Sequence, residues 1–211
     1  MNRDGMSPAA ALLFILAPVL LFIPAVLRAQ SIAPAPPDLA EQIEAGRTRL
    51  PGGAEVVYRI RLLPVASFPS LPAGIAGQLR EKDCMVPQTY AAREPENVIR
   101  GAFEKRGSDD WAVLCSMNGA TSLYVFFQSQ PDQPIMLRRQ RDAEWLGAEV
   151  VGQYGSAWGI STRNPSQIRS SNPGRHAETI DHAGIEDAFV EHSASIHYFR
   201  DGGWVTMDGG N

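Results

Sequence analysis

The clearest candidates for chemistry are four side chains gathered near the C-terminus. Asp181, His182, Glu186 and Asp187 bring carboxylates and an imidazole together in a 211-residue chain that has only 4 histidines. Histidine beside carboxylates can hold zinc or transfer protons. Because His182 and Glu186 are four positions apart, a helix would place both on one face. We therefore take this segment as the candidate binding site, with His182 as base or ligand and Glu186 or Asp187 orienting it.

The same residues also fit an ordinary helix start. Carboxylates at Glu186 and Asp187 would interact favourably with the helix dipole near an N-terminus, and His182 would then face solvent. The tight histidine–carboxylate signatures of zinc hydrolases are absent, so we assign no metal ligand, no cofactor and no catalytic residue. His197 falls in an expected strand beside Tyr198 and is interpreted as a cross-strand packing residue.

Other polar or aromatic features are given structural interpretations. Ser156 lies in Gly155-Ser156-Ala157-Trp158-Gly159, which lacks the residue order of a nucleophile elbow, and it is expected to start a strand. Arg138-Arg139-Gln140-Arg141 is a small basic patch, and a patch of that size is usually a solvated face. The four tryptophans are expected in the core or in hairpins rather than on a carbohydrate platform. The net charge of −4 argues against nucleic-acid binding.

The first 29 residues have the pattern of an export signal. Arg3 precedes an uncharged apolar stretch from Ala9 to Val26, and Ala29 followed by Gln30 suits signal-peptidase cleavage. The alternative is an uncleaved membrane anchor, because about 18 apolar residues can just span a bilayer. The sequence thus predicts a secreted or periplasmic protein, without stable membrane insertion once the signal is removed.

The two cysteines, Cys84 and Cys115, are predicted to form a disulfide. An even cysteine count in an exported chain favours pairing, with two buried free thiols as the alternative. Cys84 follows an expected helix over residues 71–82, whose Leu71, Ile75 and Leu79 form an apolar stripe. Cys115 lies in an expected strand, so the bond would join a helix to a sheet.

Alternating and turn-forming residues predict the remaining elements. Asn118-Gly119 and Asp201-Gly202-Gly203 are hairpin signals between apolar segments. Strands are expected at 55–62, 97–103, 111–116, 121–127, 135–138, 149–152, 157–161, 194–199 and 204–207. The fold class is α+β, an antiparallel sheet with one or two packed helices and one disulfide. The predicted organisation is a signal peptide at 1–29, a proline-rich leader and short helix at 30–50, and a single β-rich domain at 51–211.

One turn resembles a known calcium-binding repeat. Gly101-Ala102-Phe103 through Asp110-Trp111-Ala112-Val113 resembles the turn of FG-GAP repeats, the units of integrin-type β-propellers. The resemblance implies oxygen ligands at alternate positions, yet Ala102 and Arg106 occupy two of them here. Calcium needs six to eight oxygen ligands. We therefore expect the turn to fold without calcium, with Arg106 pairing with Glu104, Asp109 or Asp110 in place of the ion.

A wider resemblance extends over about residues 65–210. The residues that carry it are Leu71-Pro72, Cys84-Met85-Val86-Pro87-Gln88, Asn97-Val98-Ile99-Arg100-Gly101, the segment from Asp110 to Ser116, and the segment from Ile180 to Ala188. They resemble a group of uncharacterised exported bacterial proteins, which implies export and one shared domain but no activity. The sequence-based hypothesis is an exported, non-catalytic binding or interaction module with an envelope or extracellular partner. The alternative is a small hydrolase or metal-dependent enzyme centred on residues 181–187.

Overall fold

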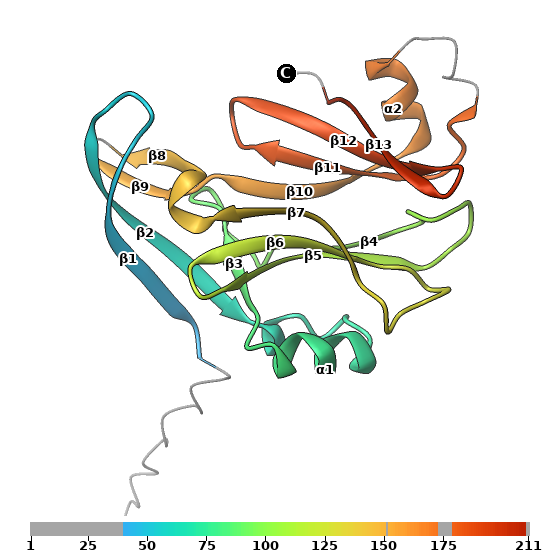
Figure 1. Cartoon of the computed structure of the whole chain (residues 1–211), viewed down its shortest axis with the longest axis horizontal. Coiled ribbons are helices and arrows are strands. Elements are labelled where there is room, and N and C mark those ends of the chain that lie inside the picture. The colour runs from blue at the N-terminus through green and yellow to red at the C-terminus, as the bar shows by residue number, and fades with distance from the viewer. Residues whose placement is uncertain (1–39, 151, 173–178, 210–211) are drawn as a thin grey trace, which may run out of the picture. The chain divides into compact units, whose positions relative to one another are not determined.

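The computed structural model describes residues 40–150, 152–172 and 179–209, which are mostly β-sheet with two α-helices (Figure 1). This agrees in outline with the predicted α+β class, although strands dominate. The helices are α1 (Ala73–Glu81) and α2 (Pro165–Ser171), and short 3-10 turns cover Val65–Ser67 and Asp142–Glu144. The strands are β1 (Gln42–Arg49), β2 (Glu55–Pro64), β3 (Met85–Gln88), β4 (Val98–Gly101), β5 (Asp110–Met117), β6 (Ala120–Phe126), β7 (Ile135–Arg141), β8 (Leu146–Val150), β9 (Gln153–Ser156), β10 (Trp158–Arg163), β11 (Gly184–Phe189), β12 (Ser193–Arg200) and β13 (Gly203–Asp208).

The strands form two sheets. The large sheet has nine strands in the order β7-β6-β5-β3-β2-β9-β8, with β1 paired to β2 and β4 paired to β5. The small sheet has the order β10-β11-β12-β13. Its neighbouring pairs are all antiparallel. In the large sheet β2 and β9 run parallel, which departs from the predicted all-antiparallel arrangement.

Both predicted hairpins are confirmed. Asn118 and Gly119 between β5 and β6 have φ angles of 54° and 73°, and Asp201 and Gly202 between β12 and β13 have 52° and 78°. Two consecutive positive φ angles define the tight turn whose twist matches that of paired strands. Asn, Asp and Gly tolerate this conformation better than other residues. The local sequence therefore fixes the register of both strand pairs.

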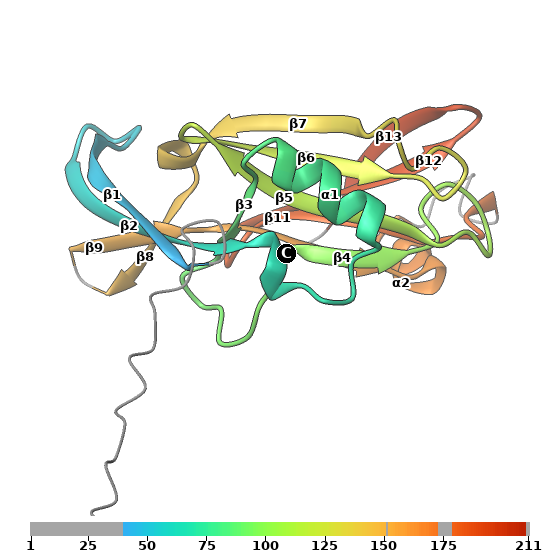
Figure 2. The ribbon, with the colours of Figure 1, turned by 90° about the horizontal axis from the view of Figure 1, so that it is seen from below.

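Helix α1 covers the outer face of the large sheet. The predicted apolar stripe is confirmed, since Leu71, Ile75 and Leu79 are all buried in one core cluster with sheet residues. The predicted disulfide is also present, and Cys84 and Cys115 lie in this cluster with their Cα atoms 5.4 Å apart. Figure 2 shows the helix lying across β5 and β6.

A second core cluster lies between the two sheets. It joins Leu114 and Leu123 of the large sheet to Trp158 and Ile185 of the small sheet. Helix α2 covers the opposite face of the small sheet, where its fully buried Ile168 packs in a third cluster. The order of layers is therefore α1, large sheet, small sheet and α2 (Figure 1).

Two predictions about local structure are wrong. The short helix expected within residues 30–50 is not formed over Gln42–Arg49, which is β1 and pairs along its whole length with β2. The sheet therefore begins before residue 51, where the predicted domain starts. The helix start expected at residues 181–187 is instead β11 (Gly184–Phe189). The predicted signal peptide and proline-rich leader lie outside the described residues, and within the described part no helix is long and apolar enough to cross a membrane.

The turn between β4 and β5 is held by a buried carboxylate. Asp110 is fully buried and accepts hydrogen bonds from protein donors on both oxygens. These donors are the backbone amides of Phe103, Glu104 and Gln128 and the hydroxyl of Ser108. Protein donors thus occupy both oxygens of Asp110, and these hydrogen bonds hold the turn closed.

The pairing predicted for Arg106 in this turn is wrong. Asp109 forms an ion pair with Arg100 instead, and Glu104 lies 3.9 Å from the ammonium of its neighbour Lys105.

Candidate functional site

The alternation of β11 separates the four predicted site residues. Successive side chains of a strand point to opposite faces, so Glu186 and Asp187 face away from each other. Asp187 shares the inner face with Ile185, which packs in the core between the sheets. Glu186 faces the other way. Its carboxylate accepts a hydrogen bond from Ser161 and forms an ion pair with Arg163, both on β10.

Asp181 and His182 precede the strand and contact neither of these carboxylates. The buried His182 ring stacks on Tyr198 with 4.3 Å between ring centroids, and its Nδ1 lies 3.1 Å from the carbonyl oxygen of Ala183. The backbone N–H of Asp181 donates to the Tyr198 hydroxyl at 3.2 Å. His182 is therefore a packing residue, and neither the predicted solvent-facing histidine nor a histidine beside Glu186 is formed.

Asp187 is the predicted residue that lies at a chemically organised site. Its side chain is completely buried and accepts from three donors on three other strands. The indole Nε1 of Trp158 donates to Oδ1 at 2.6 Å. Oδ2 lies 3.1 Å from Nη1 of Arg138 and 3.0 Å from Nε2 of His197. The carboxylate thus links the small sheet to strand β7 of the large sheet.

These contacts keep Asp187 ionised. Burial raises the pKa of Asp187, but the hydrogen bond from His197 and the positive charge of Arg138 outweigh burial and hold the pKa below its usual value of 3.8. The Thr206 hydroxyl lies 3.2 Å from His197 Nδ1. A proton on Nε2 lets His197 donate to Asp187, while its Nδ1 lies within hydrogen-bond distance of the Thr206 hydroxyl.

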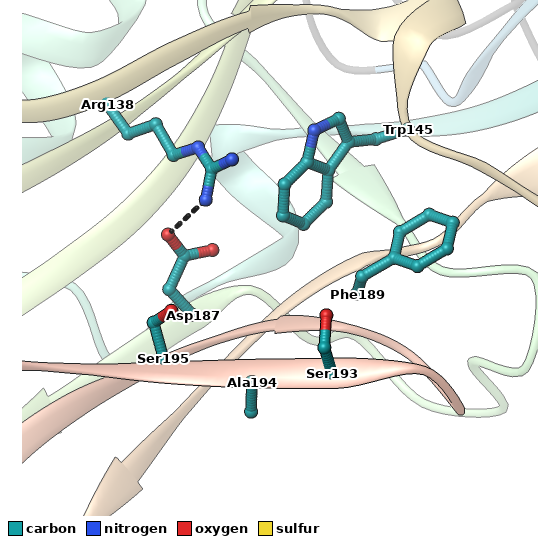
Figure 3. Close-up of a pocket in the computed structure, with 7 residues that line it drawn as sticks. All are labelled: Arg138, Trp145, Asp187, Phe189, Ser193, Ala194 and Ser195. Atoms are coloured by element: carbon teal, nitrogen blue, oxygen red, sulfur yellow. Dashed lines mark hydrogen bonds and ion pairs between the residues drawn. The ribbon is translucent and has the colours of Figure 1, made fainter. Parts of the chain in front are cut away.

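Arg138 and two aromatic rings complete the site. The guanidinium carbon of Arg138 lies 4.3 Å from the centre of the Trp145 ring, a cation–π distance. Trp145 in turn packs edge-on against Phe189 with 5.4 Å between centroids. Figure 3 shows Arg138 and Asp187 on one side of a hollow, with the rings of Trp145 and Phe189 on the other.

We call this hollow the Arg138 cavity. It has a volume of about 370 Å³ and is lined by Arg138, Trp145, Asp187, Phe189, Ser193, Ala194 and Ser195. The serines come from the start of β12, where Ser195 is paired across the sheet with Asp187. The cavity therefore combines aromatic walls, hydroxyl groups and an ion pair whose charges cancel.

The sequence interpretation missed most of this site. Arg138 was interpreted as part of a solvated basic patch, yet its side chain is only 33% exposed and its charge is paired. His197 was interpreted as a packing residue, and it does lie in a strand, but its Nε2 bonds to Asp187. Trp145 packs against the core between the sheets, in line with the expectation for the tryptophans, and it also lines the cavity. Alternation within 193–200 is the one signal that could have placed Ser195 and His197 on a common face.

The described residues offer no group of three or more histidine, cysteine, aspartate or glutamate side chains arranged to hold a metal ion. His197 and Asp187 are joined by a hydrogen bond. Asp187 is also paired with the guanidinium group of Arg138, which is a cation and not a metal ligand.

Comparison of the chain with known proteins gave no matching family model, no matching curated protein and no matching solved structure. The resemblances to FG-GAP turns and to exported bacterial proteins therefore stay predictions.

Proposed function

We propose that this protein is an exported, non-catalytic binding module whose ligand occupies the Arg138 cavity. The observation that carries the proposal is the cavity of about 370 Å³ with two aromatic walls and a fixed polar edge. Small-molecule sites are typically concave, largely apolar, and equipped with a few polar groups that orient the ligand. The Arg138 cavity is concave and carries orienting polar groups, and Trp145 and Phe189 supply the apolar part of a lining that is otherwise mainly polar.

The polar groups around the cavity are already bonded to other protein groups, and this supports the non-catalytic assignment. Both oxygens of Asp187 already accept protein hydrogen bonds. Both ring nitrogens of His197 are engaged, one with Asp187 and the other with Thr206. A general base needs a lone pair directed at the substrate. In this arrangement the carboxylate and the imidazole instead hold Arg138 and the cavity wall in place.

The lining favours an uncharged polar ligand with a flat apolar face. Arg138 and Asp187 cancel each other's charge, so the cavity offers little net attraction to an ion. The rings of Trp145 and Phe189 can stack against C–H groups, and the hydroxyls of Ser193 and Ser195 can exchange hydrogen bonds at the rim. A sugar ring has this combination of an apolar face and peripheral hydroxyl groups.

Tryptophan fluorescence can test the proposal with maltotriose and with the trimer of N-acetylglucosamine as probes. We expect a saturable change in emission with at least one probe, lost in Trp145→Ala. Trp204→Phe is the matched control, because Trp204 packs against Phe127 and Phe199 outside the cavity. Binding that survives Trp145→Ala unchanged, or the absence of binding by both probes, would overturn the assignment of a saccharide to this cavity.

Export to an oxidising compartment is part of the same proposal. It is supported by the Cys84–Cys115 disulfide and by the signal-like residues 1–29. We propose a secreted or periplasmic location, with a partner or ligand of the envelope or the extracellular space. N-terminal sequencing of protein from its native host should give a chain beginning near Gln30, and recovery of intact Met1 in membranes would instead support the anchor.

One observation favours a hydrolase as the second candidate. Thr206, His197 and Asp187 form a hydroxyl–imidazole–carboxylate chain with contacts of 3.2 Å and 3.0 Å. Such a chain can activate a nucleophile when a third group orients the base. Turnover of p-nitrophenyl acetate that is lost in both Thr206→Val and His197→Gln would establish this activity, whereas rates equal to the buffer blank would dismiss it.

A further inference from the structure

A second site lies on the ribbon formed by β1 and β2. Residues directly opposite in an antiparallel pair share a face, and the register places Ile43 beside Arg61 and Ala45 beside Arg59. Arg47 and Arg49 continue the same face. The ribbon therefore presents four arginines on one side of a chain whose overall charge is −4.

We infer that Arg59 and Arg61 form a binding site for a phosphate group. The two side chains line a cavity of about 290 Å³ between the ribbon and the loop that follows β3. The remaining lining residues are Ile43, Gln88, Thr89, Tyr90, Ala92, Gln153 and Ser156. This cavity shares no lining residue with the Arg138 cavity, so either proposal can fail without the other.

Neither arginine is held in a buried ion pair. Arg59 forms no ion pair with any described residue, and it is exposed to solvent. Arg61 lies 3.4 Å from Glu41, but that carboxylate is 48% exposed. An exposed ion pair contributes only about 0–1 kcal/mol, so an incoming anion displaces Glu41 at little cost.

Two neighbouring guanidinium groups favour phosphate over a single carboxylate. Arg59 and Arg61 are two positions apart on one strand, so their Cα atoms are about 7 Å apart on the same face. One guanidinium can already bind a carboxylate through two parallel hydrogen bonds. A tetrahedral dianion has further oxygens and a second charge, which the second guanidinium can bind.

The opposite wall of the cavity is built to stay in place. The Tyr90 side chain lies against Gly147 and Gly155, where an added Cβ atom would come within 2.5 Å of the Tyr90 ring and within 2.9 Å of the Tyr90 Cβ atom. Its hydroxyl donates to Glu191 at 2.7 Å. Burial and this hydrogen bond raise the pKa of Tyr90 to about 12, so the ring stays neutral beside a bound anion.

Isothermal titration calorimetry with sodium phosphate, against sodium chloride of equal ionic strength, tests the site in the full-length protein. We expect saturable binding of phosphate that is weakened at least tenfold in Arg59→Gln and in Arg61→Gln. Arg49→Gln is the matched control, because it removes the same charge from the same ribbon outside the cavity, and it should change affinity less than twofold. Equal weakening by Arg49→Gln would show diffuse charge attraction and overturn the site.

Two further arms identify the source of the phosphate. Acetate that binds as tightly as phosphate would overturn the preference for a dianion. Vesicles of phosphatidylglycerol, compared with phosphatidylcholine, test whether the phosphate belongs to a lipid headgroup. Sedimentation of the protein with phosphatidylglycerol vesicles but not with phosphatidylcholine vesicles, reduced in Arg59→Gln, would show that the phosphate belongs to a lipid headgroup. Binding of free phosphate without sedimentation would assign a soluble phosphate compound, and failure of both overturns the inference.

Discussion

Replacing Asp187 by asparagine should destabilise the protein strongly, although the shape of the side chain hardly changes. The three partners of Asp187, on Trp158, Arg138 and His197, are all donors. Asparagine keeps one oxygen and turns the other acceptor into a donor, so at least one buried donor loses its partner. Leaving a buried donor unpaired costs about 1–3 kcal/mol.

Loss of the negative charge adds to that cost. Removing one member of a fully buried ion pair costs about 3–5 kcal/mol. Arg138 is 33% exposed and keeps part of its hydration, so the upper part of that range does not apply. We expect Asp187→Asn to lower the free energy of unfolding by about 3 kcal/mol. For a domain of this size that corresponds to a fall in Tm of roughly 6–12 °C.

Urea unfolding followed by tryptophan fluorescence measures this difference, with the disulfide kept oxidised. Glu186→Gln is the matched control, because its carboxylate lies on the opposite face of the same strand and is partly exposed. The control should cost less than Asp187→Asn, about 1–2 kcal/mol, because the Glu186 carboxylate keeps some contact with water and its partner Arg163 is 33% exposed. A loss below 1 kcal/mol in Asp187→Asn, or an equal loss in both variants, would refute the role assigned to the buried carboxylate.

Three further predictions concern other parts of the molecule. Replacing Cys84 and Cys115 by alanine should lower the free energy of unfolding in urea by about 3–4 kcal/mol, because the bond closes a loop with a sequence separation of 31; an unchanged midpoint would contradict this. Calcium should leave the Tm of the wild type unchanged, whereas Asp110→Ala should lower it with or without calcium; a calcium-dependent rise lost in this variant would contradict the amide-closed turn. Burial and the nearby Asp142 raise the pKa of Glu44 above 4.5, so its contribution to stability is complete below pH 4.5 and is lost as pH rises through the raised pKa. Glu44→Gln should therefore gain stability relative to the wild type between pH 4 and pH 7 in urea titrations, and a constant difference would refute the raised pKa.

Features that depend on neighbours in sequence could be predicted. Asn118-Gly119 specifies a turn through the conformations that these two residues tolerate, and the structure has that turn. The stripe of Leu71, Ile75 and Leu79 specifies a buried helical face without reference to the rest of the chain. The even cysteine count predicts the disulfide, and packing of that stripe on β5 brings Cys115 to Cys84 so that the bond can form.

Strands β1 and β11 could not be predicted because their sequences lack a clean apolar alternation. Ile43 of β1 is 47% exposed, and Glu44 on the alternate face is polar. The Asp38-Leu39-Ala40-Glu41 pattern before it favoured a helix start. In β11 the inward positions include Asp187, so a charge stands where the alternating pattern needs an apolar residue.

The candidate site shows why closeness in sequence misled the interpretation. Asp181, His182 and Glu186 lie within six residues of Asp187, and none of them contacts its carboxylate. The groups that do contact it are 49, 29 and 10 residues away, on β7, β10 and β12. A helix would have gathered the local cluster, whereas a strand sends alternate side chains to opposite faces. Once residues 184–189 are a strand, Asp187 takes two of its partners from the neighbouring strands β10 and β12 and the third from β7 of the sheet packed against it. The site is therefore a product of sheet packing, and Arg138 belongs to it because β7 lies over β11.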